Sequence, residues 1–481
     1  MVDCSDRVRK CPFQGAIASS AAFVFTAAIL FASTGSAGSA QSTTQNPATS
    51  GTQDVEAPAP QVPVQPTKPA PSRVKERFLV DRFPEKPSIS PSWSIPLEPL
   101  GFSAPGAIYL GERSTFASLD FINEDHLLLT FRVPGLLHRD TRSGESSDER
   151  QIRAVVLALP KGTVEAEGQW TLHDRSRYLW MLKNGHFLLR DRNNLLEGDT
   201  TLKLKPMLDF PGSLLSLDLD PAQNLIVTNS REPSTKPAKP GQVPSPGSAS
   251  ATITADSDST AADNTAPDLV VRILRRDSGE VLLVSRARGE VHLPINSQGY
   301  VENLRGRAEE WVLDLSYFTG GTKMLGSVGS ACVPSDDFLS ETEILATGCA
   351  AGGEIQLTAI TTAGQTLWET QAPATMIWPQ MAVSANGQRL AWETIDTDRA
   401  VSAFAPIGSE NIKEQSITVF DAATGDIAMV SPASPILDAG GNVALSPSGR
   451  RVALINAGAI QVFELPAPPP LPAAIEKPPA R

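Results

Sequence analysis

The chain has 481 residues, with 53 acidic against 41 basic side chains and a formal net charge of −12. No block of Lys or Arg stands out, whereas nucleic-acid-binding proteins usually carry a clustered basic face. Composition therefore argues against a nucleic-acid partner and indicates only an anionic surface. The length allows one large all-β domain or two to three domains of ordinary size.

The N-terminus has the pattern of a secretory signal. Arg7, Arg9 and Lys10 precede an uncharged apolar stretch at 15–32, and small residues follow at 36–40. This order predicts a signal peptide over 1–40, cleaved after Ala40. The alternative is an uncleaved membrane anchor, because a stretch of this length can just span a bilayer. In both cases the rest of the chain is expected outside the cytoplasm, in the periplasm or the extracellular space.

Proline-rich stretches divide the remaining chain. Residues 41–72 and 466–481, together with an internal stretch at 231–267, contain almost no large apolar side chains. Such segments cannot bury enough surface to become ordered. The predicted organisation is a disordered spacer over 41–77 and a folded region over 78–466. A surface loop at 231–267 interrupts the folded region, and a Pro-rich tail follows over 467–481.

Within the folded region two strand-turn-strand phrases alternate. The first phrase is a polar turn between two apolar runs, and the second is an apolar strand, a Gly turn and a new strand. Copies of the first lie at 116–131, 214–228, 337–348, 381–393 and 443–455. Copies of the second lie at 155–164, 270–282, 357–368 and 417–427. The Gly of each tight turn supplies the positive φ that hairpins need.

A further hairpin is predicted at 177–190. Its Asn184-Gly185 pair is the usual signal for a two-residue type I′ turn. The first arm, at 178–182, is apolar on both faces, which predicts an inner strand between two sheets.

Repetition of one small β unit predicts a radial arrangement of sheets. Seven units are expected to begin near Ser114, Trp170, Ser213, Trp311, Asp337, Met381 and Val443. The fold class is therefore all-β, a single β-propeller of about seven four-stranded blades, with six or eight possible. The last unit is short, so a strand from 93–110, or one just after it, is expected to complete the final blade.

Two repeat families resemble these phrases. Residues 446–453 (SPSGRRVA) resemble the S-P-D-G-R-x-[ILV]-A phrase of WD40-like repeats in exported bacterial propellers. Residues 384–391 keep the same frame without its Pro or Asp. Residues 359–369 and 419–426 resemble the A-x-D-x-x-T-G-x-x-x-W phrase of quinoprotein-like repeats. The resemblance implies an exported bacterial β-propeller and carries no catalytic residue over to this chain.

Cysteine usage predicts one structural disulfide. Cys4 and Cys11 would leave with the signal peptide, so Cys332 and Cys349 remain. Two cysteines in an exported protein most simply pair with each other. The alternative, a redox-active pair, lacks the Cys-x-x-Cys spacing that such chemistry favours.

No motif for catalysis or for a cofactor stands out. There is no Gly-x-Ser-x-Gly, and the histidines show no metal-ligand spacing and are expected on turns and strand ends. They are His126, His138, His173, His186 and His292. Asp218 and Asp220 are expected on the outward face of a strand, with a pair of acid-base carboxylates as the alternative. Trp368 is expected to pack between blades rather than against a quinone. No catalytic, cofactor-binding or metal-ligating residue is predicted.

The sequence favours a non-catalytic exported propeller that serves as a docking platform for an envelope or extracellular protein or glycan. The alternative is an enzyme at the channel mouth, lactonase-like or quinone-dependent. Three or more acidic or His side chains that converge at one mouth would favour a metal-dependent enzyme, and an apolar or isolated polar lining would favour docking. Membrane contact is expected only through an uncleaved N-terminal segment.

Overall fold

The computed structural model describes residues 77–78, 83–135, 138–140, 147–232, 269–287, 289–400 and 407–468. The predicted signal segment, most of the spacer, the inserted loop from 233 onward and the tail from 469 lie outside the described residues. Those predictions therefore stay predictions. No helix in the described ranges is long and apolar enough to cross a membrane.

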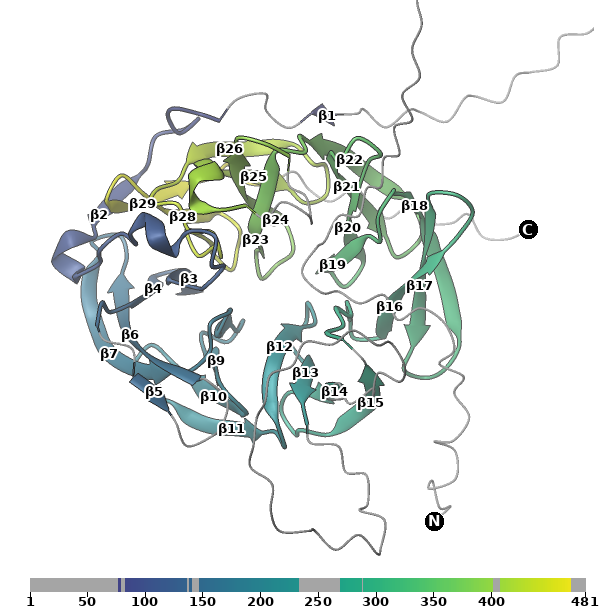
Figure 1. Cartoon of the computed structure of the whole chain (residues 1–481), viewed down its shortest axis with the longest axis horizontal. Coiled ribbons are helices and arrows are strands. Elements are labelled where there is room, and N and C mark those ends of the chain that lie inside the picture. The colour runs from purple at the N-terminus through teal and green to yellow at the C-terminus, as the bar shows by residue number, and fades with distance from the viewer. Residues whose placement is uncertain are drawn as a thin grey trace, which may run out of the picture.

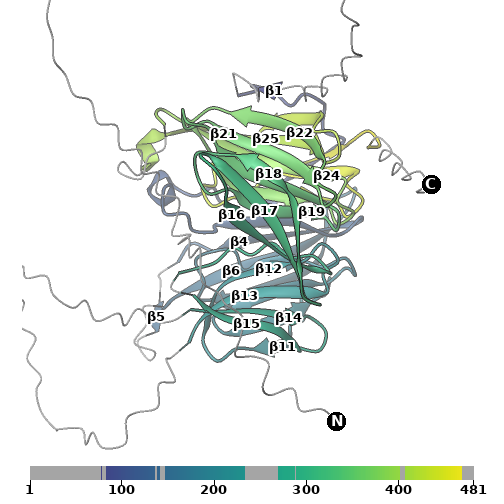
Figure 2. The ribbon, with the colours of Figure 1, turned by 90° about the vertical axis from the view of Figure 1, so that its right-hand side faces the viewer.

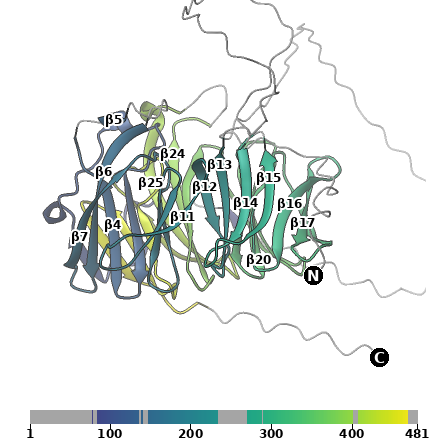
Figure 3. The same cartoon turned by 90° about the horizontal axis from the view of Figure 1, so that it is seen from below.

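Seven β-sheets stand around a common axis as the blades of a propeller (Figure 1). Side views show the strands running between the two faces of the ring (Figure 2, Figure 3). Successive strands within a blade are antiparallel, so the turns from strand one to two and from strand three to four lie on the same face. We call this the turn face. The prediction of a single all-β propeller with seven four-stranded blades is confirmed.

The first three blades follow one another in chain order. Blade one holds β3 (Ala117–Asn123), β4 (His126–Arg132), β6 (Ser147–Ala158) and β7 (Thr163–Leu172), with β5 (His138–Asp140) added along β6. Blade two holds β8 (Leu179–Met181), β9 (Phe187–Asp191), β10 (Asn194–Gly198) and β11 (Lys205–Asp209). Blade three holds β12 (Ser213–Leu219), β13 (Leu225–Arg231), β14 (Leu269–Arg275) and β15 (Val281–Ala287).

The other four blades complete the ring. Blade four holds β16 (Gly299–Arg305), β17 (Glu310–Tyr317) and β18 (Thr322–Gly329), and a bridge from Ile295 to Tyr300 supplies its innermost edge. Blade five holds β19 (Ser335–Ser340), β20 (Glu343–Cys349), β21 (Ile355–Thr361) and β22 (Thr366–Ala372), with β1 (Arg77–Phe78) parallel to β22. Blade six holds β23 (Met376–Val383), β24 (Arg389–Thr397), β25 (Ile412–Asp421) and β26 (Ile427–Pro432). Blade seven holds β27 (Val443–Leu445), β28 (Arg451–Asn456), β29 (Ala459–Glu464) and β2 (Trp93–Pro96). Three short 3₁₀ helices are η1 (Glu98–Leu100), η2 (Ala107–Tyr109) and η3 (Ser409–Asn411).

The two sequence phrases correspond to the two halves of a blade. Every copy of the first phrase forms strands one and two, and every copy of the second forms strands three and four. In blades three, six and seven the first turn follows one scheme. A Ser or Asp oxygen accepts the amide hydrogen of the residue five positions later at 2.6–3.1 Å. The pairs are Asp220–Leu225, Ser384–Arg389 and Ser446–Arg451. The residue three positions after that Ser or Asp has a φ between +60° and +74°, which glycine adopts without steric cost.

Two of the seven predicted unit starts are wrong. Trp170 lies near the end of β7, the outer strand of blade one, and blade two begins at β8. Trp311 lies on β17, well inside blade four. The innermost edge of blade four is reduced to a single bridge at Ile295, so no strand-turn-strand phrase marks its beginning. Large aromatic residues pack between blades on strands of any rank and do not mark where a unit starts.

The hairpin between β8 and β9 also differs from its prediction. Only Gly185 has a positive φ, +77°, whereas a type I′ turn needs one at Asn184 as well. The amide of Leu182 donates to the carbonyl oxygen of His186 at 2.9 Å, which leaves a three-residue loop. The prediction of an inner strand is confirmed, because Leu179 packs against blade one and Trp180 against blade three.

The ring is closed by pairing the two ends of the propeller. β2 is antiparallel to β29, with Trp93 opposite Val462 and Ile95 opposite Ile460. β2 is thus the outer strand of a blade whose other strands come from the C-terminal end (Figure 1). This confirms that the 93–110 segment completes the last blade.

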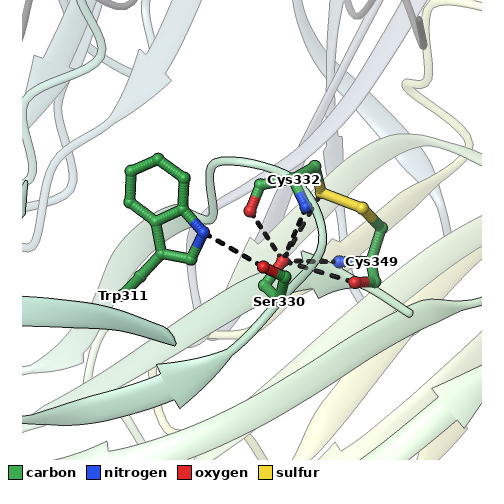
Figure 4. Close-up of a disulfide and its surroundings, with 4 residues drawn as sticks. All are labelled: Trp311, Ser330, Cys332 and Cys349. Atoms are coloured by element: carbon green, nitrogen blue, oxygen red, sulfur yellow. Dashed lines mark hydrogen bonds between the residues drawn. A yellow bond between two sulfur atoms is a disulfide. The ribbon is translucent and has the colours of Figure 1, made fainter. Parts of the chain in front are cut away.

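Cys332 and Cys349 form a disulfide with their Cα atoms 5.6 Å apart (Figure 4). Cys332 lies between blades four and five, and Cys349 ends β20. The Ser330 hydroxyl accepts the amide hydrogen of Cys349 at 3.0 Å and donates to the carbonyl oxygen of Cys332 at 2.7 Å. The predicted structural disulfide is confirmed, and it favours an oxidising compartment.

Candidate binding site in the central channel

A cavity of about 730 Å³ lies along the propeller axis and is lined by residues from all seven blades. One lining residue from each blade, in order, is Phe121, Met181, Asp218, His292, Phe338, Met381 and Ala444. The lining continues through first turns of blades three, five, six and seven, at 220–223, 340–342, 384–387 and 447. The cavity therefore extends from the innermost strands to the turn face.

Five charged side chains of alternating sign follow one another along this lining from blade one to blade five. We call them the charged belt: Asp120, Arg177, Asp218, His292 and Asp337. His292 is the best defined member. Its Nδ1 lies 3.6 Å from Oδ2 of Asp218, and its Nε2 lies 3.3 Å from Oδ1 of Asp337. Nε2 also donates to the carbonyl oxygen of Asp336 at 2.6 Å.

Electrostatics keep His292 and Asp218 charged. Burial lowers the pKa of His292, but Asp337 and Asp218 outweigh it and hold the pKa well above its usual value. Burial raises the pKa of Asp218, yet the hydrogen bond and charge of His292, with the charge of Arg177, bring it below its usual value. Near neutral pH these two residues therefore form an ion pair.

Arg177 and Asp120 continue the belt into blades two and one. Nε of Arg177 donates to the carbonyl oxygen of Leu179 at 3.1 Å, and its guanidinium lies 5.3 Å from the ring centre of Trp180. Asp120 accepts the Ser118 hydroxyl at 2.6 Å. Burial raises the pKa of Asp120 to about 6, against the lowering effects of Ser118 and Arg177. Asp120 lies deep among protein atoms but still reaches the cavity.

Blades six and seven line the cavity without a charged side chain. Their strand residues on the lining are Gln380, Met381, Ala382, Val383, Leu390, Val443, Ala444 and Leu445. Val383 remains 37% exposed although it is a large apolar residue. The lining of the cavity is therefore charged over five blades and mainly apolar over the other two.

The arrangement was only partly visible in the sequence. Asp218 and Asp220 were expected on an outward face, and this is wrong. Asp218 faces the channel, and Asp220 is 1% exposed, with its Oδ1 accepting the amide of Leu225. A usable signal exists, because Asp120 and Asp218 are each the acidic residue between two apolar residues of a first strand. The first phrases of blades six and seven lack it.

The other predicted positions lie elsewhere. His126, His173 and His186 sit at turns and strand ends beside Glu165, Asp191 and Glu197, as expected. The side chain of His138 lies outside the described part. His292 differs from the expectation, because it lines the cavity between Asp218 and Asp337.

Six acidic or His side chains line one channel, which is the pattern that would favour a metal-dependent enzyme: Asp120, Asp218, Asp220, His292, Asp337 and Glu341. Both ring nitrogens of His292 are already engaged by Asp218, Asp337 and the Asp336 carbonyl. Within the described ranges, no group of three or more His, Cys, Asp or Glu residues is placed to hold a metal ion. The geometry provides a row of charged side chains beside an open volume, in which His292 contacts both Asp218 and Asp337.

No protein-family model matches the chain, and no curated protein is similar to it in sequence. Among solved structures, acylaminoacyl peptidase from Pyrococcus horikoshii is 11% identical with a TM-score of 0.41, over 73% of this chain and 51% of that chain. The propeller domain of the Trilobed protease from Pyrococcus furiosus is 11% identical with a TM-score of 0.40, over 73% and 96%. TolB from Acinetobacter baumannii is 12% identical with a TM-score of 0.33, over 71% and 80%. The chain thus spans about half the length of the first of these proteins.

Proposed function

We propose that the chain is a non-catalytic, exported β-propeller that docks a protein or glycan partner at the turn-face opening of its central channel. The observation that carries this proposal is the cavity of about 730 Å³ with its charged belt. Asp120, Asp218 and Asp337 lie on the innermost strands of their blades, and His292 contacts both Asp218 and Asp337. Fixed polar groups in a largely pre-formed cavity give orientation and specificity to a bound partner.

Export is part of the same proposal. The Cys332–Cys349 disulfide favours an oxidising compartment, and the uncharged stretch at 15–32 after a basic segment has the pattern of a secretory signal. The partner is accordingly sought among envelope and extracellular molecules.

The test compares capture by matched variants. Thr342 is exposed in the first turn of blade five and lines the cavity, while Thr163 is exposed on the outer strand of blade one. The full chain, Thr342→Arg and Thr163→Arg are incubated with native envelope extract, and the bound molecules are quantified by mass spectrometry. Circular dichroism checks that both variants are folded.

The proposal expects a stoichiometric partner that Thr342→Arg loses and Thr163→Arg retains. A partner held equally by all three proteins would contradict docking at this opening. A blank with the unmodified chain would contradict docking altogether.

A further inference from the structure

The lining of the cavity carries an excess of negative charge. Its acidic members are Asp120, Asp218, Asp220, Asp337 and Glu341, and its basic members are Arg177, Lys183 and His292. With His292 protonated, five negative charges face three positive ones, a net charge of −2. Two of the acidic groups serve the fold, because Asp220 accepts the Leu225 amide and Glu341 accepts the Ser297 amide. The remaining lining then has three aspartates against three cations, and within the belt, which leaves out the exposed Lys183, three aspartates face two cations.

Two belt carboxylates keep capacity for a ligand. His292 contacts Oδ2 of Asp218 and Oδ1 of Asp337. In the described part of the chain, the second oxygen of each carboxylate has no hydrogen-bond partner. Each of these two side chains lines the cavity and is 42% exposed, which leaves room for a ligand beside the carboxylates. An ionised carboxylate only accepts hydrogen bonds, so the ligand group beside it must be a donor.

Charge and hydrogen bonding together select an organic cation. An ammonium or guanidinium supplies several N–H donors and a positive charge, and bonds to carboxylates are stronger when both partners are charged. His292 cannot also donate to the second carboxylate oxygens of Asp218 and Asp337, because its two ring nitrogens already face the first oxygens and the Asp336 carbonyl. A neutral donor would leave the excess charge of the belt uncompensated.

The opposite part of the lining adds an apolar requirement. Met381, Val383 and Leu445 belong to the uncharged strands of blades six and seven, and Val383 is 37% exposed. The volume of about 730 Å³ lies within the range of roughly 300–1,000 Å³ of pockets that enclose small ligands or a few side chains. A cation with an apolar neighbour matches both parts of the lining at once.

We infer that the channel receives an extended peptide segment of the docked partner, with a lysine or arginine side chain against Asp218 and Asp337 and an adjacent apolar side chain against blades six and seven. This inference rests on the proposed docking function and names the chemistry of the segment that enters. In an extended segment alternate side chains point to opposite sides, so a basic residue and its apolar neighbour can reach the two parts of the lining.

A selection experiment tests the inference with a defined probe. Random linear peptides displayed on phage are selected on the full chain, and the most enriched peptide is synthesised with a fluorophore for anisotropy titrations. We expect enrichment of Lys or Arg beside an apolar residue. Replacing the basic residue by norleucine, and separately replacing both Asp218→Asn and Asp337→Asn, should each weaken binding about tenfold or more. The matched control carries Asp277→Asn and Asp314→Asn, outside the cavity, and should bind as the unmodified chain does.

The outcomes separate this inference from docking itself. Enriched peptides without a basic residue, or basic peptides that bind the Asp218/Asp337 double variant equally well, would overturn the inference, while loss of binding in Thr342→Arg would still support docking. If free lysine amide competed as well as the peptide, the site would take a small cation and the peptide inference would be wrong. If no peptide were enriched, the result would contradict both the inference and the docking of a peptide in the channel. The norleucine peptide keeps the test valid even if the double variant does not fold.

Discussion

The indole nitrogen of Trp368 donates a hydrogen bond of 2.6 Å to the carbonyl oxygen of Ala422. Trp368 lies on β22 of blade five, and Ala422 follows β25 of blade six, so the bond joins neighbouring blades. The indole also stacks on Phe420, with ring centres 6.1 Å apart and an interplanar angle of 13°. Trp368 is only 4% exposed, and the expectation that it packs between blades is confirmed.

Replacing Trp368 by Phe should therefore lower the free energy of unfolding by more than the loss of side-chain volume alone would lower it. The Ala422 carbonyl would be left buried without its donor, which costs about 1–3 kcal/mol. Trp392→Phe is the matched control, because Trp392 is 0% exposed and its indole nitrogen has no partner in the described part of the chain. Urea unfolding measures both variants. Equal losses would show that the Trp368 bond contributes nothing.

The pH dependence of stability should report the ion pairs of His292. Its pKa is raised in the folded protein by Asp337 and Asp218, so its contribution is fully present below the unfolded pKa of about 6.5 and is lost as pH rises through the folded pKa. The stability difference between the unmodified chain and His292→Gln, on the order of 1 kcal/mol for a partly exposed pair, should therefore shrink as the pH is raised above neutral. Melting temperatures from pH 6 to 10 measure this. His186→Gln is the control, and a difference that grew with pH would contradict the assignment.

Much of the fold could be predicted because its repeated turns have local chemical causes. The Ser446 hydroxyl accepts the amide hydrogen of Arg451, and Gly449 has a φ of +66°. The Ser-x-x-Gly phrase therefore predicts the turn even from a single copy. Blade closure was also predictable. The final unit lacks its outer strand, and a strand from the other end of the chain can pair with the edge that would otherwise stay open. The type I′ prediction failed because Asn-Gly also fits a longer loop in which only Gly185 is left-handed.

The candidate binding site could not be assembled from sequence because its members come from different blades. Asp218 and Asp337 lie on separate first strands, and His292 belongs to a blade whose innermost edge is a single bridge without any phrase. An acidic residue between two apolar ones marks Asp120 and Asp218 on their first strands, but this signal does not show which residues of other blades lie beside them. Only the closed ring of blades places His292 between the two carboxylates.

The disulfide should stabilise the blade four to blade five junction. Cys332 and Cys349 are separated by 17 positions, and a loop of this size reduces the entropy of the unfolded chain by an amount worth about 3 kcal/mol. Cys332→Ser should lower the melting temperature of the oxidised protein accordingly. Adding dithiothreitol should lower the melting temperature of the unmodified chain to that of the variant and leave the variant unchanged. An unchanged melting temperature in Cys332→Ser would contradict a stabilising role.

Ring closure should depend on the apolar anchor of β2. Ile95 is 6% exposed and belongs to the core cluster shared by blades one and seven, whereas its neighbour Ser94 is exposed. Ile95→Ala should cost about 2–5 kcal/mol through lost burial and a residual cavity, and Ser94→Ala should cost almost nothing. Chemical unfolding measures both. A loss below about 0.5 kcal/mol in Ile95→Ala would mean that β2 contributes little to closure.

Glu393 is an acidic side chain at 0% exposure on β24, beside the start of blade seven. The side-chain amide of Gln415 donates to its Oε1. Burial raises its pKa from 4.5 to about 8, against the lowering effects of the Gly441 and Asn442 amides and of Gln415. The folded protein therefore holds this carboxyl neutral at pH 7, while the unfolded chain ionises it.

This difference fixes the sign of a pH effect. Because the folded pKa lies above the unfolded one, the free energy of unfolding should fall as pH rises from about 4.5 toward 8. Glu393→Gln stays neutral at every pH and removes that slope. The free energy of unfolding of the variant should therefore rise relative to that of the unmodified chain as the pH is raised. The gain is limited to a few kcal/mol, since each pKa unit corresponds to about 1.4 kcal/mol. Urea unfolding at pH 5 and pH 8 measures it, with the exposed Glu414→Gln as control. Parallel pH profiles for the unmodified chain and Glu393→Gln would show that Glu393 is already ionised in the folded protein.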